Sequence, residues 1–165
     1  MTQPKTKPRP NGLDKPVTKK IIKRMSAAHI WLYKKTGGRL GKKWHVGSAM
    51  RKGVPICLLT TTGAKSGLPR EVPLLYMDDG ADVIVVASQG GLPTNPQWYR
   101  NLLANPSVQV RIGRKIRDMT ARTASATERA RLWPLLVELY ADFASYQTWT
   151  DREIPVVICS PASSD

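Results

Sequence analysis

The sequence lacks the features that identify several large classes of protein. No apolar run approaches the roughly 18–20 residues that a membrane span requires, and the start has neither the apolar segment nor the small-residue cleavage site of a signal peptide. The two cysteines form no CxxC pair, and the two histidines give a zinc or iron–sulfur site little support. We therefore expect a cytoplasmic protein with no metal, in which Cys57 and Cys159 are reduced thiols buried in strands.

Acidic residues are nearly missing from the first 52 positions. There the chain has 15 of its 26 Lys and Arg but only one acidic residue, Asp14, whereas residues 53–165 hold eleven of each sign. The length of 165 residues suits one domain with its own core. We therefore expect a basic N-terminal part joined to a neutral globular domain at 53–165. Residues 1–17, with four prolines among lysines, are predicted to be a disordered arm.

Residues 18–52 are predicted to form a basic amphipathic helix followed by a Gly/Lys-rich linker. From 18 to 35 the residues Ile21, Ile22, Met25, Ala28, Leu32 and Tyr33 share one helical face, and the lysines and arginine lie opposite. Ile30 and Trp31 interrupt the basic face, and Gly37-Gly38 ends the helix. Such a helix favours an anionic membrane surface, which predicts a peripheral position on the inner face of the cell membrane. Packing of the helix on the globular domain is the alternative.

Beyond Gly53, short strand patterns alternate with turn signals. The expected strands are 55–62, 70–77, 82–87, 108–112, 115–122 and 154–159. Helices are expected at 97–104, with Asn95 as the cap, and from the capping box at 125–128 to about Tyr140, with a kink at Pro134. Strands joined mostly by hairpins, with few helices, predict a mainly β, α+β fold: a six-stranded antiparallel barrel with helices outside.

The first candidate site is the hairpin tip TTTGAKSGLPR at residues 60–70. Its two glycines allow the backbone N–H groups to point outward, and Lys65 and Arg70 flank the turn with positive charge. The order of residues is not that of a P-loop, and no helix follows. The tip is therefore either an anion-binding turn or an ordinary hairpin tip with solvated charges.

Two further segments have residues suited to ligand binding. Ser88-Gln89-Gly90-Gly91 follows a strand and leads to a helix, so a ligand could approach the backbone there; a flexible loop with Trp98 and Tyr99 in the core is the alternative. An aromatic stripe at a spacing of three is either core or the wall of a cleft, and comprises Tyr140, Phe143, Tyr146 and Trp149. Motifs such as GxSxG, HExxH or a convergent carboxylate pair are missing, so an enzyme of this kind needs a cofactor for its chemistry.

The globular part closely resembles the deazaflavin (coenzyme F420)-dependent nitroreductase family of actinobacteria. About two thirds of the chain carries the resemblance, in the right order, through LLTTTGAKSGLPREVPLLY, VIVVASQGG, NPQWYRNLLANPSVQV, TARTASATERARLWPLL and SYQTWTDREIPVVIC. Members of that family have a split β-barrel, FMN-binding-like fold and use reduced coenzyme F420, an 8-hydroxy-5-deazaflavin, as hydride donor. The resemblance thus implies the same fold and cofactor for this chain.

The resemblance also implies roles for the cofactor-binding residues. The family's TTGxKSGxPR hairpin holds the phosphate and anionic tail of the cofactor, and its residues here are Lys65, Ser66 and Arg70. The residues expected to line the deazaflavin ring are Pro73, Leu74, Ala87 and Ser88. Those expected in the neighbouring wall are Trp98, Tyr99 and Asn101.

The acceptor side is implied in the same way. Tyr140 and Tyr146 match family tyrosines that border the acceptor pocket, and Phe143 stands where the family has a third tyrosine. We expect Ser88 and Tyr146 to hydrogen bond near the reacting centre. The chain also departs from the family pattern at Ala64, Leu75 and Gln89, where a basic residue, an aromatic residue and a lysine are common. Quinone reduction needs fewer specific contacts than reduction of bicyclic nitroimidazoles, so these departures favour it.

The sequence therefore predicts a reductase that transfers a hydride from reduced coenzyme F420 to a quinone-like or nitroaromatic acceptor. An FMN-type split-barrel flavoprotein has the same fold, and only the resemblance separates the two. A nucleic-acid-binding protein driven by the basic arm is the third reading, and the neutral globular domain argues against nucleic acid as a partner. Both a monomer and a homodimer remain compatible with the sequence.

Overall fold

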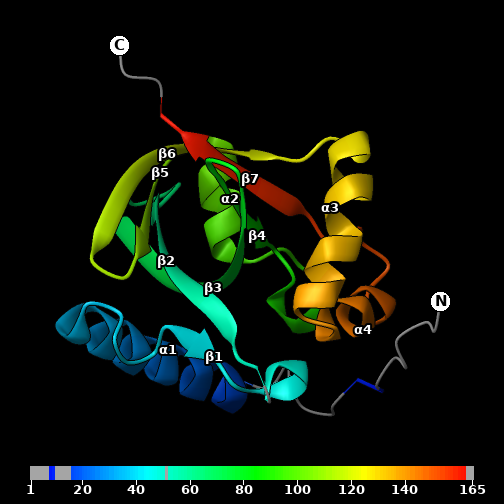
Figure 1. Ribbon diagram of the computed structural model, residues 1–165, viewed down its shortest axis with the longest axis horizontal. Helices are drawn as coiled ribbons and strands as arrows, with labels where there is room; N and C mark the ends of the chain where they lie inside the picture. The colour runs from blue at the N-terminus through cyan, green and yellow to red at the C-terminus, as the bar shows by residue number, and fades with distance from the viewer. Residues whose placement is uncertain (1–7, 10–15, 51, 163–165) are drawn as a thin grey trace.

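The computed structural model describes residues 8–9, 16–50 and 52–162, and excludes the side chains of 16–20, 22 and 23 (Figure 1). Most of the predicted disordered arm at 1–17 lies outside the described residues. The first helix begins at Pro16, two residues before its predicted start. Proline suits the first turn of a helix, because the N–H that it lacks would have no partner there.

Strands and helices follow one another as the turn signals predict. The strands are β1 (Lys43–Trp44), β2 (Val54–Thr62), β3 (Pro69–Asp79), β4 (Asp82–Val86), β5 (Ser107–Ile112), β6 (Lys115–Thr123) and β7 (Val156–Pro161). The helices are α1 (Pro16–Thr36), α2 (Gln97–Ala104), α3 (Ala126–Leu139) and α4 (Asp142–Thr148), with 3-10 turns η1 (Gly47–Ala49) and η2 (Gln89–Gly91). Helix α3 has the predicted capping box and continues through Pro134.

The predicted six-stranded antiparallel barrel is confirmed. The strands pair in the order β1-β2-β3-β4-β7-β6-β5, all antiparallel, and a β2–β5 pairing closes β2 to β7 into a barrel. The last strand begins two residues later than predicted, after Pro155, which has no N–H to donate to a ladder. The predicted linker contains β1 and η1. These elements have only two and three residues, which is too short for a recognisable sequence pattern.

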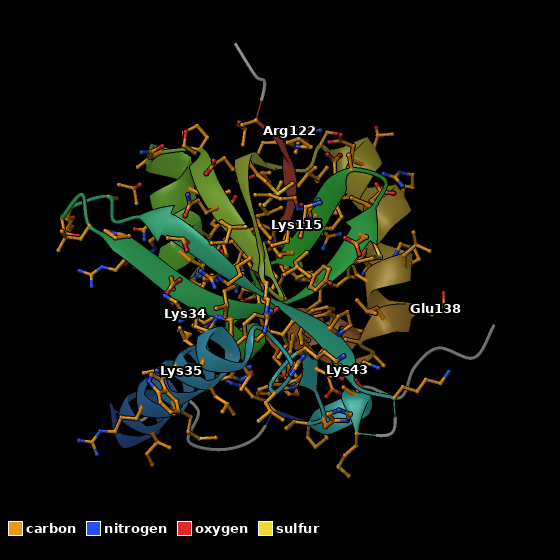
Figure 2. The ribbon with its side chains drawn as sticks, turned by 60° about the vertical axis from the view of Figure 1, so that its left-hand side comes forward. Lys34, Lys35, Lys43, Lys115, Arg122 and Glu138 are labelled. Atoms are coloured by element: carbon orange, nitrogen blue, oxygen red, sulfur yellow. The ribbon has the colours of Figure 1, made fainter. Side chains whose placement is uncertain are left out.

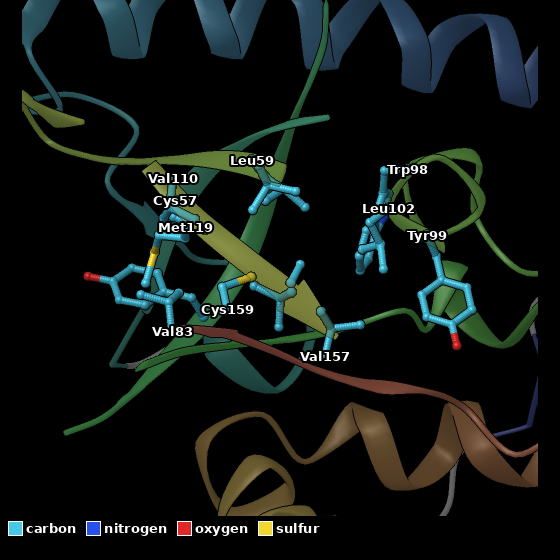
Figure 3. Packing of buried hydrophobic residues seen from close by; sticks show 14 of the residues in the cluster. Cys57, Leu59, Val83, Trp98, Tyr99, Leu102, Val110, Met119, Val157 and Cys159 are labelled. Atoms are coloured by element: carbon cyan, nitrogen blue, oxygen red, sulfur yellow. The ribbon is translucent and has the colours of Figure 1, made fainter. Parts of the chain in front are cut away.

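The barrel interior is apolar and contains both thiols. Cys57 and Cys159 are fully buried and free, as predicted, beside Val83 and Met119 (Figure 3). Helix α2 closes one end of this core with Trp98, Tyr99 and Leu102. A second core lies outside the barrel, where α3 and α4 pack with residues of β4 and β7 (Figure 1).

Helix α1 packs against the barrel beside β3 through one edge of its predicted apolar face (Figure 1). Tyr33 is fully buried, donates a hydrogen bond to the Ile56 carbonyl (3.1 Å) and accepts one from the Gly113 N–H (2.7 Å). Ile30, which seemed only to interrupt the basic face, packs against Ile56 and its neighbours. Because Tyr33 and Ile30 form the contact, Met25 and other residues of the predicted apolar face remain exposed.

Candidate functional site

The β2–β3 hairpin tip forms one wall of a cavity of about 700 Å³. Thr62 pairs with Pro69, so residues 63–68 form the tip, and two backbone bonds fold it: Gly63 N–H to Leu68 O and Gly67 N–H to Gly63 O, both 2.8 Å. The Ser66 hydroxyl accepts hydrogen bonds from the Leu68 N–H (3.3 Å) and the Arg70 guanidinium (3.5 Å). The structure thus brings Lys65, Ser66 and Arg70 together, all exposed on this cavity.

Helix α2 forms the opposite wall and holds the tip in place. The Asn101 side chain is almost fully buried; its amide nitrogen donates to the Thr61 hydroxyl (3.1 Å), and its oxygen accepts from the Ala64 N–H (3.2 Å). Gln97 also donates to that oxygen (3.1 Å). Both Asn101 and Trp98 line the cavity. Asn101 therefore fixes the backbone next to Lys65, whatever it contributes to a ligand.

A second, apolar cavity of about 200 Å³ is also lined by residues of β3. Residues 70–72 line the larger cavity and 73–75 the smaller one, so the two follow each other on one strand. The remaining lining residues come from β1, β2, β4, the loop after β4 and the α3–α4 region: Trp44, Ile56, Val86, Ser88, Gly90, Tyr140, Phe143 and Tyr146. The predicted ring-lining residues Pro73, Leu74 and Ser88 thus meet the predicted acceptor-side aromatics at one cavity.

The aromatic stripe is both core and cavity wall. Tyr140 caps the end of α3, Phe143 and Tyr146 lie on α4, and their ring centroids are 5.1–6.3 Å apart. The hydroxyl oxygens of Tyr140 and Tyr146 are 3.2 Å apart, within hydrogen-bond distance. Burial, followed by the Tyr146 contact, raises the pKa of Tyr140 above its ordinary value of 10, so this hydroxyl is protonated at neutral pH. Trp149 continues the stripe but does not line the cavity.

Two residues expected in the cofactor site lie in the barrel core. Ala87 is fully buried and lines neither cavity. Tyr99 packs in the barrel core, and its hydroxyl lies 2.8 Å from that of Thr123 (Figure 3). Their neighbours Ser88 and Trp98 line the cavities instead, because adjacent side chains on one backbone point to different sides. Contact of Ala87 and Tyr99 with a cofactor stays a prediction.

Several residues at the site were not predicted from the sequence. Trp44, placed in a linker by the sequence, lines the apolar cavity from β1. The N-terminal segment is held there by Asp142, which accepts a hydrogen bond from the Ser48 N–H (3.0 Å). Arg152 donates hydrogen bonds to the Ser88 carbonyl and to the side-chain oxygen of Asn95. That corrects the prediction of Asn95 as the α2 cap: Pro96 is the cap, with no side-chain bond.

The arrangement fits a ligand with an apolar ring system at one end and an anionic group at the other. The apolar cavity offers Pro73 and Leu74 for ring contact, and the larger cavity offers the Lys65 ammonium and the Arg70 guanidinium for an anion. A deazaflavin with a phosphorylated tail has this division. In the described part of the chain, no group of three or more His, Cys, Asp or Glu could hold a metal ion.

The chain is similar to several known proteins. A family model described as F420H(2)-dependent quinone reductase matches residues 25–161. A Mycobacterium tuberculosis protein named F420H(2)-dependent quinone reductase is 40% identical over 133 residues, which cover 79% of this chain and 85% of that protein. A second protein of that organism, named provisionally for the same activity, is 52% identical over 70% of this chain and 98% of its own length.

Two solved structures are similar as well. One is described as an F420-H2 dependent reductase, with 50% identity and a TM-score of 0.60 over 64% of this chain and 94% of that chain. The other is described as a domain-swapped dimer, with 40% identity and a TM-score of 0.63 over 87% of this chain and 99% of that chain.

Proposed function

The chain belongs to the F420H(2)-dependent quinone reductase family, and on that premise we propose that it transfers a hydride from reduced coenzyme F420 to a quinone. The observation that carries the proposal is that consecutive residues of β3 line two cavities, one with the cations Lys65 and Arg70 and one that is apolar. A nitroaromatic compound is a second acceptor class that the same apolar cavity could take.

The hairpin tip would hold the anionic end of the cofactor. Lys65 supplies an ammonium and Arg70 a guanidinium, while Ser66 adds a hydroxyl that already orients Arg70. Because Asn101 fixes the tip backbone, these groups are presented without a large ordering cost on binding.

The apolar cavity would hold the ring end and the acceptor together. When bound, the reduced deazaflavin would supply a hydride. Its ring carbon favours the transfer of two electrons together over the transfer of one. The protein excludes water with Pro73, Leu74 and Phe143 and keeps the two reactants in contact. Reduction of a quinone places negative charge on its oxygen, and hydroxyl groups aimed at that oxygen stabilise it.

Ser88 and Tyr146 are the proposed donors to that oxygen. Both line the apolar cavity, from the loop after β4 and from α4 respectively. The Tyr140 hydroxyl lies within hydrogen-bond distance of that of Tyr146, and this contact restricts the orientation of the Tyr146 hydroxyl. The proton that completes the hydroquinone comes from one of these hydroxyls or from solvent.

The first experiment is to mix the protein with reduced coenzyme F420 and menadione and follow the return of the oxidised deazaflavin absorbance. We expect menadione-dependent oxidation by the wild type and a loss of at least tenfold in cofactor affinity in Lys65→Ala/Arg70→Ala, since each charge-assisted bond contributes about 1.5–3 kcal/mol. Arg24→Ala/Lys115→Ala removes the same charge from exposed sites that line neither cavity, and should behave like the wild type. Absence of oxidation with tight FMN binding would overturn the proposal.

We also propose that α1 places the enzyme on an anionic membrane surface, near lipid-soluble quinones. No described helix is long and apolar enough to span a membrane. Ile21, Met25 and Leu32 share one face of α1 and are 53%, 66% and 37% exposed. Lys34 and Lys35 of α1 and Lys43 of β1 lie in the part of the molecule that contains α1 (Figure 2), and Lys34 is paired with Glu71. Apolar insertion combined with roughly 1 kcal/mol for each cation near an anionic leaflet supports such binding.

Co-sedimentation with vesicles tests this placement. We expect binding to phosphatidylserine-containing vesicles, little binding to phosphatidylcholine alone, and loss of binding in Met25→Asp/Leu32→Asp. Leu103→Asp/Leu135→Asp is the matched control, because it adds the same charge at leucines that are 61% and 44% exposed on α2 and α3. Unchanged vesicle binding by the α1 variant would contradict the proposal. A change in its oligomeric size instead would assign the exposed apolar face of α1 to self-association.

A further inference from the structure

Arg152 holds the loop that forms the Ser88 side of the apolar cavity. Its Nε donates to the Leu92 carbonyl (2.9 Å), and Nη2 donates to the carbonyls of Ser88 (2.8 Å) and Ala87 (3.2 Å). Its Nη1 donates to the Asn95 side-chain oxygen (2.8 Å). All four acceptors belong to the connection between β4 and α2, and Arg152 itself lines neither cavity.

That loop has a backbone that needs external support. Gln89, Gly90 and Gly91 have φ values of 48°, 62° and 73°, and Gln89 is the one non-glycine residue with positive φ in the described chain. A side chain in this region is strained, and such conformations persist where surrounding contacts fix them. The carbonyls of Ala87, Ser88 and Leu92 also converge on one point, where their partial negative charges would repel without a cation. The planar guanidinium satisfies all of them at once.

The other end of Arg152 is attached to the helix that bears Tyr146. Gln147 of α4 donates from Nε2 to the Arg152 carbonyl (2.8 Å), and its Oε1 accepts the Ile154 N–H (2.9 Å). Helix α4 also packs closely on η2, since a Cβ on Gly91 would lie 2.8 Å from the Tyr146 carbonyl. Arg152 therefore connects the two elements that carry the proposed hydrogen-bond donors of the reaction.

We propose that Arg152 is a positioning residue that sets the separation of Ser88 from Tyr146 and so the alignment of donor and acceptor. The expected effect on kcat rests on the proposed function. The expected effect on the loop after β4 does not depend on it. Lysine cannot replace the guanidinium fully. Arg152 donates from three separate nitrogens, Nε, Nη1 and Nη2, whereas a lysine has a single donor nitrogen.

The test compares Arg152→Gln and Arg152→Lys with the wild type. Arg131→Gln is the matched control. The Arg131 guanidinium makes a bidentate contact with the Asp79 carboxylate (2.6 and 3.3 Å), and neither residue lines a cavity of the site. Three quantities are measured: kcat and KM with reduced coenzyme F420 and menadione, the Kd of oxidised coenzyme F420, and hydrogen exchange of individual amides.

We expect Arg152→Gln to lower kcat at least tenfold and to change the Kd of the cofactor by less than threefold, since the hairpin tip is untouched. The Gly91 and Leu92 amides, which donate to the Ser88 and Gln89 carbonyls, should exchange at least tenfold faster, while barrel amides such as that of Leu58 keep their rates. Arg152→Lys should fall between the two, and Arg131→Gln should match the wild type.

Each result has a defined meaning. Wild-type kcat and unchanged Gly91 and Leu92 exchange in Arg152→Gln would overturn the inference. A uniform rise in exchange at all amides, with kcat per folded molecule retained, would show a role in stability only and would also overturn it. If Arg152→Gln does not fold, the same comparison in Arg152→Lys decides. If the wild type does not oxidise reduced coenzyme F420, the proposed function fails, and the local exchange still decides whether Arg152 positions the loop.

Discussion

At the scale of single residues, Glu71 is the unexpected member of the cationic cavity. It lines the cavity beside Arg70, where a carboxylate opposes the binding of an anion. Lys34 of α1 compensates for it, with Nζ 2.9 and 3.2 Å from the two carboxylate oxygens. The pair is partly exposed, so its own contribution to stability is small. Its effect should appear in cofactor affinity instead.

Glu71→Gln should therefore bind oxidised coenzyme F420 on the order of 2–5-fold more tightly, and Lys34→Ala should bind it more weakly by a similar factor, as expected for a partly screened charge worth up to about 1 kcal/mol. Fluorescence titration at low and high salt measures both, and the difference should shrink at high salt. Glu138→Gln, an exposed site on α3 away from this cavity (Figure 2), is the control. Shifts of the same sign in both variants would contradict the argument.

At the scale of elements, the segment from β1 to β2 forms part of the wall of the apolar cavity. Trp44 lines the cavity, and Gly47 has a φ of 64° with no room for a side chain. A Cβ there would meet the Asp142 carboxylate and lie 2.9 Å from the Tyr140 hydroxyl. A substitution at Gly47 therefore pushes on the two groups that hold the aromatic wall.

Gly47→Ala should raise the KM for menadione several-fold and leave the Kd of the cofactor nearly unchanged. Gly80→Ala is a closely matched control, because Gly80 has a φ of 66° and open space around its Cβ position. Both variants carry a similar backbone cost of about 1 kcal/mol, so thermal unfolding should shift in both. Steady-state kinetics then separate strain from displacement of the wall: an equal KM in the two variants would rule out the displacement.

The barrel, the hairpin tip and α2 could be predicted because each rests on a local pattern. The capping box at 125–128 predicted the start of α3, and apolar runs predicted strands of the right order. Trp44 and Arg152 could not be assigned, since their partners lie far along the chain and no short motif marks the contacts. The packing of α1 was predicted only in part for the same reason: Tyr33 belongs to the predicted apolar face, but its contacts and those of Ile30 leave Met25 and Leu32 exposed.

At the scale of the whole molecule, the two thiols in the barrel interior make the free energy of unfolding depend on pH in the alkaline range. Burial raises the pKa of the Cys57 thiol and raises that of Cys159 to about 12, both from 9.0. Between pH 9 and 12 the unfolded chain releases thiol protons that the folded chain keeps. The stability that these thiols contribute is therefore complete below pH 9 and is lost as the pH rises towards the folded pKa.

Urea unfolding between pH 7 and 10, with a reductant present, should show this dependence. The free energy of unfolding should fall above pH 9 by about 1.4 kcal/mol per pH unit for each thiol. Burial also raises the pKa of Tyr76, from 10.0 to about 12, so measurements up to pH 10 limit its contribution. Cys57→Ser/Cys159→Ser should be less stable at pH 7, because two hydroxyls replace apolar thiols in the core, yet its stability should decline less between pH 9 and 10. Parallel curves for the variant and the wild type would show that the barrel interior does not hold these protons, and would place the alkaline loss in surface groups.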